Sequence, residues 1–243
     1  MKRLARLGSL FILFSLVVGC CFMKVPPLDN SRYISMDQVV PINPESVYFI
    51  TMVHTLTGTM MYGSAILIDS DENGGWALSA GHVCYPEDQD PYVTHLDDWE
   101  MVATGFDGTA LPMVPIGIDV VKDICVFRIP VITSHTVKLA KSMPAIGSRV
   151  YLGAYPHGMY LPGTVPLFEG FYCGSEDTWS EYSVPVAPGS SGGGIVNSKG
   201  ELIGIVSMSL ITFENLVLAA KLEDIKNLLN MVKKNPYRLT IVR

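Results

Sequence analysis

The chain has 243 residues, of which 49% are hydrophobic and 16% are charged, so it can bury a sizeable core and is not a disordered tail. Its 17 Lys and Arg residues against 23 Asp and Glu residues give a formal net charge of -6. A net negative surface gains nothing from meeting a nucleic acid or an anionic bilayer, which argues against either as a direct partner.

The first residues have the pattern of a signal peptide. Basic residues precede an apolar stretch from Leu10 to Met23, which is shorter than the roughly 20 residues that cross a bilayer as a helix. The end of this stretch, Val-Val-Gly-Cys at residues 17–20, resembles a bacterial lipobox. We therefore expect a signal peptide over residues 1–19 and a lipid on Cys20 that anchors the chain to a membrane outside the cytoplasm. An ordinary cleaved signal, with a secreted or periplasmic product, and an uncleaved anchor are the alternatives.

Two different patterns follow the leader. Residues 20–45 contain four prolines and no apolar periodicity, which predicts an extended tether. From residue 46 onward, short runs rich in β-branched and aromatic residues are separated by Gly, Pro, Asn and Asp. These runs are VYFITMV, GSAILI, GGWALSA, DICVFRI, RVYLGAY, GGGIVN, ELIGIVSMS and NLVLAA. Their spacing predicts a β-barrel or sandwich rather than a parallel sheet with crossover helices.

One helix is predicted near the end of the chain. The segment LEDIKNLLNMVKK, which begins at Leu222, has its apolar residues at helical spacing on one face. We expect a helix over residues 222–235 and a tail over residues 236–243.

Three of the five cysteines lie outside the leader: Cys84, Cys125 and Cys173. An odd set of three permits at most one disulfide. Cys84 follows His82 by two residues and Cys125 follows Asp123 by two, so a Cys84–Cys125 disulfide can form if that histidine and aspartate meet. The cysteines show no C-x-x-C spacing and the histidines no i, i+4 pair, so we expect no metal site.

The most informative motif is Gly189-Ser190-Ser191-Gly192-Gly193, directly before an apolar run. The glycines allow a tight turn that brings backbone amides close to a reacting carbonyl, which suits Ser191 as a nucleophile. The spacing Gly-x-Ser-x-Gly also matches the nucleophile elbow of α/β-hydrolases, but that site needs a histidine after the serine. The last histidine is His157, so a catalytic base has to lie upstream of Ser191.

Two upstream residues are candidates for the base and its partner. His82 is the only histidine that follows a strand-like run ending in small residues, which let its ring approach other side chains. Asp123 begins an apolar run, where a carboxylate is costly to bury unless it accepts hydrogen bonds, for instance from an imidazole N–H. Asp119 is the alternative acid. The order His82, Asp123, Ser191 leaves room for several strands between each pair.

Together these motifs resemble the trypsin-like (chymotrypsin-fold) serine proteases, and most closely their bacterial HtrA-like branch. The resemblance covers residues 48–230 and rests on GSAILIDSDENGGWALSAGHV, KDICVFRIP, GSRVYLGAYPHG and PGSSGGGIVNSKGELIGIVS. It implies an all-β domain over residues 46–235, with two six-stranded antiparallel barrels at 46–138 and 139–221 and the active site between them. The HtrA-like branch usually adds a peptide-binding PDZ domain, which we do not expect in this chain because only a short tail is predicted after the helix.

The resemblance also implies roles for individual residues. Ser191 attacks the scissile carbonyl, His82 takes its proton, and Asp123 orients His82. The backbone N–H groups of Gly189 and Ser191 form the oxyanion hole. The chain is then a serine endopeptidase acting on a protein or peptide through an acyl-enzyme, with no cofactor. Ser190 stands where the digestive enzymes carry an aspartate that pairs with a newly cut N-terminus, so we expect the enzyme to be made in competent form.

Residues expected at the substrate pocket follow from the same resemblance. Ser207 matches the serine that bonds the catalytic aspartate. Pro185 stands where a trypsin-like choice of Lys or Arg needs a carboxylate, and Met208, Ser209 and Ala219 match other walls. We therefore expect an apolar or small side chain before the cut.

Two other functions compete with the protease. The first is a protease-fold lipoprotein whose cleft binds an extended peptide by strand addition without cutting it. The second is a hydrolase that uses the same acyl chemistry on an ester.

Overall fold

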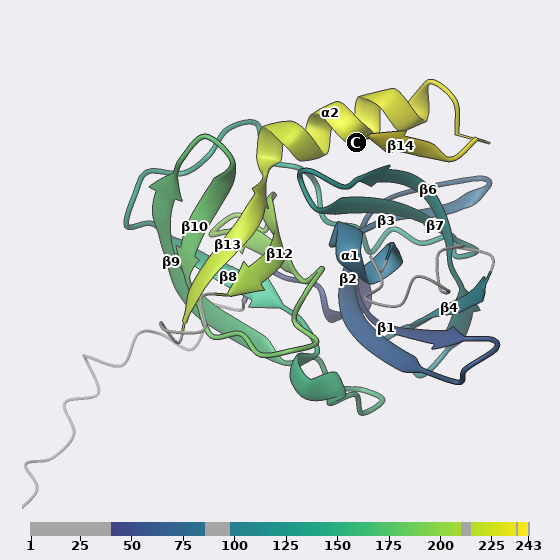
Figure 1. The fold of residues 1–243 in the computed structure, drawn as a ribbon. Coiled ribbons are helices and arrows are strands. Elements are labelled where there is room, and N and C mark those ends of the chain that lie inside the picture. The colour runs from purple at the N-terminus through teal and green to yellow at the C-terminus, as the bar shows by residue number, and fades with distance from the viewer. Residues whose placement is uncertain (1–39, 86–97, 210–214, 237, 243) are drawn as a thin grey trace, which may run out of the picture. The chain divides into compact units, whose positions relative to one another are not determined.

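The computed structural model describes residues 40–85, 98–209, 215–236 and 238–242 (Figure 1). The expected signal peptide, Cys20 and most of the expected tether lie outside these ranges. Within them, the helices are too short or too polar to cross a membrane.

Seven strands from the first half of the chain and one from its end form a twisted sheet of eight strands. They are β1 (Val47–His54), β2 (Met60–Asp71), β3 (Gly74–Ser79), β4 (Trp99–Thr104), β5 (Ala110–Pro112), β6 (Val114–Asp119), β7 (Ile124–Ile129) and β14 (Thr240–Val242). Their order across the sheet is β14-β6-β7-β3-β2-β1-β4-β5, and only the pair of β14 with β6 is parallel. Asp71 pairs with Gly74 across the two-residue turn Glu72-Asn73, so β2 and β3 form a hairpin.

The second half forms a closed six-stranded barrel (Figure 1). Its strands are β8 (Arg149–Gly153), β9 (Leu167–Ser175), β10 (Trp179–Ser183), β11 (Gly194–Asn197), β12 (Leu202–Ser209) and β13 (Leu216–Lys221). Side chains from all six strands fill its interior, with Tyr182 and Ile195 fully buried.

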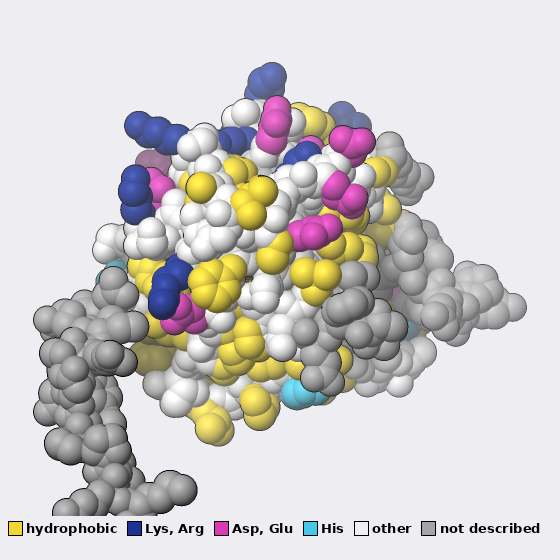
Figure 2. Space-filling view, turned by 90° about the vertical axis from the view of Figure 1, so that its left-hand side faces the viewer, with side chains coloured by type: hydrophobic (Ala, Val, Ile, Leu, Met, Phe, Trp, Pro, Cys, Tyr) yellow, Lys and Arg dark blue, Asp and Glu magenta, His cyan; other side chains and the backbone are white. Residues whose placement is uncertain are grey.

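Figure 2 shows one face of the molecule, on which basic and acidic side chains are mixed above a mostly hydrophobic and uncharged lower part.

The predicted all-β class with a C-terminal helix is confirmed. The second half is a six-stranded barrel as expected. The first sheet is instead a half-barrel of eight strands, in which β5 and β14 form the two edges. β14 lies in the segment predicted to be a tail. Three residues are too few to show a period, so the residue pattern does not predict this strand. Its pairing with β6 joins distant parts of the chain.

The helices among the described residues are η2 (Pro44–Ser46), α1 (Gly81–Cys84), η4 (Pro156–Gly158) and α2 (Leu222–Lys233). α2 contacts β6 and β7 of the first half and β12 and β13 of the second, so it lies across both (Figure 1). Its apolar face is buried at Leu222, Ile225, Leu228, Leu229 and Val232. Gly117 in β6 provides the space for Val232, because a Cβ at this glycine would overlap the Val232 methyl group.

We expect Gly117→Ala to lower the free energy of unfolding by about 1–3 kcal/mol, because the added methyl group pushes α2 away from β6. Urea unfolding followed by circular dichroism measures this loss. In the double variant Gly117→Ala/Val232→Ala, the shortened side chain makes room for the new methyl group, so the loss should be smaller than the sum of the two single losses. Strictly additive losses would show that this contact is not the cause.

Candidate active site

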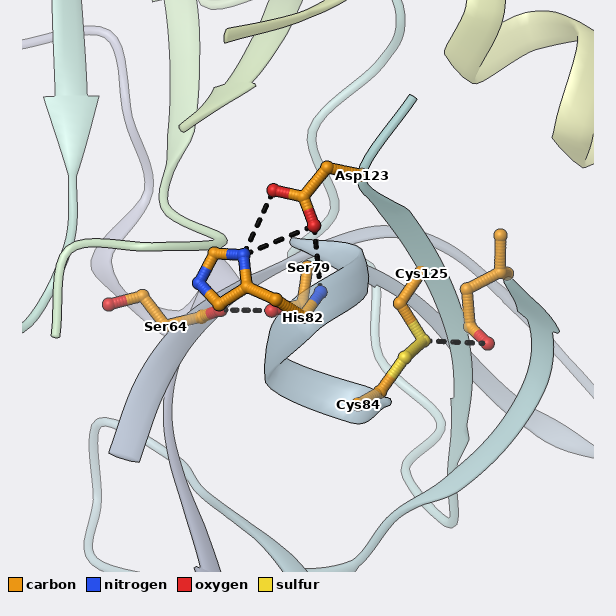
Figure 3. The surroundings of a disulfide bond; sticks show 7 residues. Ser64, Ser79, His82, Cys84, Asp123 and Cys125 are labelled. Carbon is orange, nitrogen blue, oxygen red and sulfur yellow. Dashed lines mark hydrogen bonds and ion pairs between the residues drawn. A yellow bond between two sulfur atoms is a disulfide. The ribbon is translucent and has the colours of Figure 1, made fainter. Parts of the chain in front are cut away.

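His82 and Asp123 face each other across a short gap between α1 and the turn before β7 (Figure 3). His82 Nδ1 lies 2.9 Å from Asp123 Oδ2 and 3.1 Å from Oδ1, and the backbone N–H of His82 donates to Oδ1 at 2.7 Å. One carboxylate therefore holds both the ring and the backbone of the histidine. Because Nδ1 faces an acceptor, it carries the proton of the neutral ring and leaves Nε2 free to accept one.

The surroundings of Asp123 favour its charged form. The side chain is only 15% exposed, and the Ser207 hydroxyl donates a hydrogen bond to Oδ2. Burial works to raise the pKa of Asp123, but the hydrogen bonds from His82 and Ser207 and the charge of His82 outweigh it, so the pKa stays below its usual 3.8. The backbone of Asp123 has a φ of 50°, a costly conformation for a residue other than glycine that is often found at functional sites. Asp119, the alternative acid, instead accepts the backbone N–H of Lys122.

Ser191 lies in the turn before β11, which is fastened to the first half of the chain. Its carbonyl accepts the backbone N–H of Ser64 in β2 at 2.8 Å. A Cβ at Gly192 would overlap the Ser64 carbonyl and the Ser79 hydroxyl and lie 3.0 Å from the amide nitrogen of Ala80. The loop that carries Ser191 therefore packs against the residues that lead directly into α1 and His82.

Within the described residues, the Ser191 hydroxyl and the His82 ring form no hydrogen bond with each other. The residues that flank Ser191 and His82 nevertheless pack together. In ligand-free sites this contact often tightens only when a substrate is bound.

The peptide group before Gly189 has a defined direction. The carbonyl of Pro188 accepts the backbone N–H of His157 in η4 at 2.5 Å. The peptide bonds of the described residues are all trans, and in a trans peptide the C=O and N–H point in opposite directions, so the N–H of Gly189 points away from η4. Gly189 itself has a φ of 95°, and a Cβ there would lie 2.7 Å from the Tyr155 carbonyl. This position therefore requires glycine.

The peptide group before Ser191 is oriented in the same way. The carbonyl of Ser190 accepts the N–H of Gly193 at 2.9 Å, so the N–H of Ser191 points to the opposite side. Within the described residues, neither the Gly189 nor the Ser191 N–H donates to a protein acceptor. Two free donors beside a serine hydroxyl can stabilise a negatively charged oxygen.

The residues expected at the substrate pocket lie around β12 and β13. Met208, which is 44% exposed, and Ser209 form the exposed end of β12, next to the Ser207 hydroxyl that bonds Asp123. Ala219 on β13 pairs with Val206 and is fully buried. Pro185 is exposed and precedes the turn that carries Ser191.

A cavity of about 110 Å³ opens beside the histidine. It is lined by Gly81, His82, Tyr85, Ile118, Val120 and Asp123. Most of these side chains are apolar or aromatic, so the cavity suits an apolar group.

Ser64 is a residue that the sequence analysis missed. Its buried hydroxyl donates to the carbonyl of Gly189 at 2.8 Å and accepts the N–H of Tyr155 at 2.9 Å. Together with the backbone bond to Ser191, it ties β2 to the nucleophile loop and to the end of β8. A serine inside the apolar run GSAILI was the signal, because a buried hydroxyl needs a partner.

The structure decides the pairing that the sequence left open: a disulfide joins Cys84 in α1 to Cys125 in β7 (Figure 3), and both residues are fully buried. Cys173 is a free and partly exposed thiol. In the ranges that the structure covers, His, Cys, Asp and Glu side chains do not gather in groups of three or more that could hold a metal ion.

Comparisons with known proteins identify the family of the chain and its fold. The family described as trypsin-like peptidase domain matches residues 63–205, which is more than half of the chain and includes His82, Asp123 and Ser191. No curated protein matches the sequence.

Many solved structures share the fold. The serine endoprotease from Yersinia pestis matches with a TM-score of 0.66 at 18% identity, over 82% of this chain and 66% of that one. The active form of the Rv3671c protease from M. tuberculosis has a TM-score of 0.62 at 14% identity, over 77% of this chain and 80% of that one. The HtrA-type protease AlgW with tripeptide has a TM-score of 0.64 at 17% identity, over 79% and 62%. The chain thus spans about two thirds of the first and third proteins.

We expect Ser207→Ala to slow hydrolysis about tenfold, since a lost hydrogen bond to a charged group costs about 1.5 kcal/mol. The pKa of Asp123 lies below 3.8, so its charged form contributes stability that is complete above pH 3.8 and is lost as the pH falls through the native pKa. Removing the Ser207 hydroxyl raises this pKa, and acid unfolding should therefore begin at a higher pH.

The measurements are the hydrolysis rate and the acid unfolding curve of Ser207→Ala against Ser183→Ala, which removes an exposed hydroxyl from β10. An acid midpoint and a rate equal to those of the Ser183 variant would contradict the assigned role of Ser207.

Proposed function

We propose that this chain, which belongs to the trypsin-like peptidase family, is a serine endopeptidase that cuts peptide bonds through Ser191, His82 and Asp123. The observation that carries the proposal is the contact of His82 Nδ1 and the His82 backbone with one Asp123 carboxylate, close to a serine loop with two free N–H donors. A fold and family shared with serine proteases support the same conclusion.

The reaction follows from the direction of each proton. As Ser191 Oγ attacks the carbonyl carbon, its proton passes to His82 Nε2, which is the unprotonated nitrogen because Nδ1–H donates to Asp123. The imidazolium that forms is stabilised by the carboxylate 2.9 Å away. His82 then gives this proton to the leaving amine, and a water molecule, activated in the same way, hydrolyses the acyl-enzyme.

Charge on the carbonyl oxygen is the second requirement. The N–H groups of Gly189 and Ser191 are held in position by carbonyls that bind elsewhere, so they need no rearrangement when the oxyanion forms. Each such donor is worth about 100- to 1000-fold in rate.

The nucleophile loop also supports synthesis in a competent form. Ser190 is buried, its hydroxyl accepts the Ala187 N–H at 3.2 Å, and its own N–H donates to the Ala187 carbonyl. These local bonds hold the loop without an ion pair to a new N-terminus.

The expected substrate has an apolar or small side chain before the cut. The walls assigned to this pocket offer a methionine, a serine and a buried alanine, and Pro185 supplies no carboxylate for Lys or Arg. The cavity beside His82 adds room for a further apolar group of the substrate.

A fluorophosphonate probe should label the folded wild-type chain, and Ser191→Ala should abolish labelling, because the probe captures only an activated serine. Ser198→Ala, in the exposed turn between β11 and β12, is the matched control and should be labelled like wild type. A peptide library digested with the same preparation reports the residue before the cut.

Labelling that does not depend on Ser191, or a folded wild-type chain that takes no label at neutral pH, would contradict the proposed endopeptidase activity. The second result would favour a cleft that binds peptides without cutting them.

We further propose that the enzyme works outside the cytoplasm, anchored by a lipid on Cys20. The Cys84–Cys125 disulfide supports such a compartment, since disulfides persist mainly in oxidising surroundings. Growth with radiolabelled palmitate should label the full chain, and Cys20→Ser should lose this label while Cys173→Ser keeps it. Palmitate on both variants, or on neither the variants nor the wild type, would rule the Cys20 anchor out.

A further inference from the structure

The helix that carries His82 has little stability of its own. α1 is a single turn of four residues, Gly81–Cys84, and its N-cap residue Ala80 makes no side-chain cap. One turn of helix fixes several backbone angles for very few hydrogen bonds, so it forms only where tertiary contacts hold it. The position of the His82 ring therefore depends on what holds α1.

The N-terminal end of α1 is held by Asp123. The carboxylate accepts the His82 N–H, and a Cβ at Gly81 would lie 3.0 Å from both Asp123 Oδ1 and the amide nitrogen of Ile124. Ser79, just before α1, also pairs with Cys125 across β3 and β7. The start of the helix is thus packed tightly on the turn that carries the acid.

The C-terminal end of α1 is held by the disulfide (Figure 3). Cys84 and Cys125 have Cα atoms 6.4 Å apart, and the bridge joins segments 41 residues apart in the chain. Residues two apart in a helix point in opposite directions. His82 therefore points out, with 46% of its side chain exposed, while Cys84 points into the core.

The bridge and the triad contact close one ring. From His82 this closed path runs through Val83 to Cys84 and crosses the disulfide to Cys125. It then returns along the chain to Asp123, whose carboxylate binds the imidazole and the backbone N–H of His82. Any rotation of α1 that would separate His82 from Asp123 has to move Cys84 against Cys125. The covalent link opposes that motion directly.

We propose that the Cys84–Cys125 disulfide is a positioning device for catalysis, which keeps the His82 ring in register with Asp123. The inference rests on the proposed function, since it needs Ser191 to be activated by His82. It differs from a purely stabilising role, because loss of the bridge should slow the activated serine even in a chain that remains folded.

The test uses the full chain in detergent, with Cys84→Ala/Cys125→Ala and a second, better-filled variant, Cys84→Ala/Cys125→Val. The probe is a fluorophosphonate. We expect the labelling rate at saturating probe to fall about tenfold or more, since a displacement of about 1 Å can cost about 100-fold. The probe concentration at half saturation should stay the same, because the bridge does not touch the substrate pocket.

Two controls separate positioning from stability. Val150→Ala removes part of a fully buried side chain in β8 of the second barrel, and it should lower the unfolding temperature without slowing labelling. In an Asp123→Asn background, removing the bridge should change the labelling rate less than twofold, because the contact that it protects is already lost.

Each result decides the inference. A wild-type chain without label overturns the proposed function and this inference with it. A labelled wild type with equally fast bridge variants overturns the inference alone, as does an equal slowing of Val150→Ala. If neither bridge variant folds at any temperature, the disulfide has a folding role only and the inference fails.

Discussion

The site depends on one partly buried carboxylate. Removing Asp123 from most of the solvent would favour its neutral form, and the hydrogen bonds from His82 and Ser207 reverse that preference. The same bonds determine which nitrogen of His82 carries the proton. A charged acid, mostly removed from solvent, thus sets the tautomer of His82 and leaves Nε2 as the ring nitrogen that can accept a proton.

A second constraint brings the serine to that pair. Ser64 belongs to β2 in the first sheet, yet its backbone and hydroxyl bind Ser191, Gly189 and Tyr155 of the second half. A buried hydroxyl with a donor and an acceptor on the other half leaves few alternative arrangements, because breaking either bond would bury an unsatisfied polar group. The loop that carries Ser191 is therefore held by the sheet that leads into His82.

Short segments of the site are made rigid by close packing at glycines and by the disulfide. α1 and the serine loop are too short to be stable alone, and both are held by glycines that accept close neighbours. At Gly81 and Gly192 a Cβ would meet Asp123 and Ser64, so these contacts exist only because the side chains are absent. The disulfide adds a covalent restraint at the end of α1 that has no such packing against Asp123.

The sequence by itself determined the all-β class, the final helix and the order of histidine, aspartate and serine, because these depend on local periods and on residue types with few structural uses. The two equal offsets made a Cys84–Cys125 disulfide conceivable but left the pairing of the three cysteines open, and the structure decided it. Only the tertiary structure decided the parallel pairing of β14 with β6, the bridging role of Ser64 and the direction of the N–H groups at Gly189 and Ser191. Each of these depends on hydrogen bonds between residues far apart in the chain, whose partners become neighbours only after the two halves have folded and packed together.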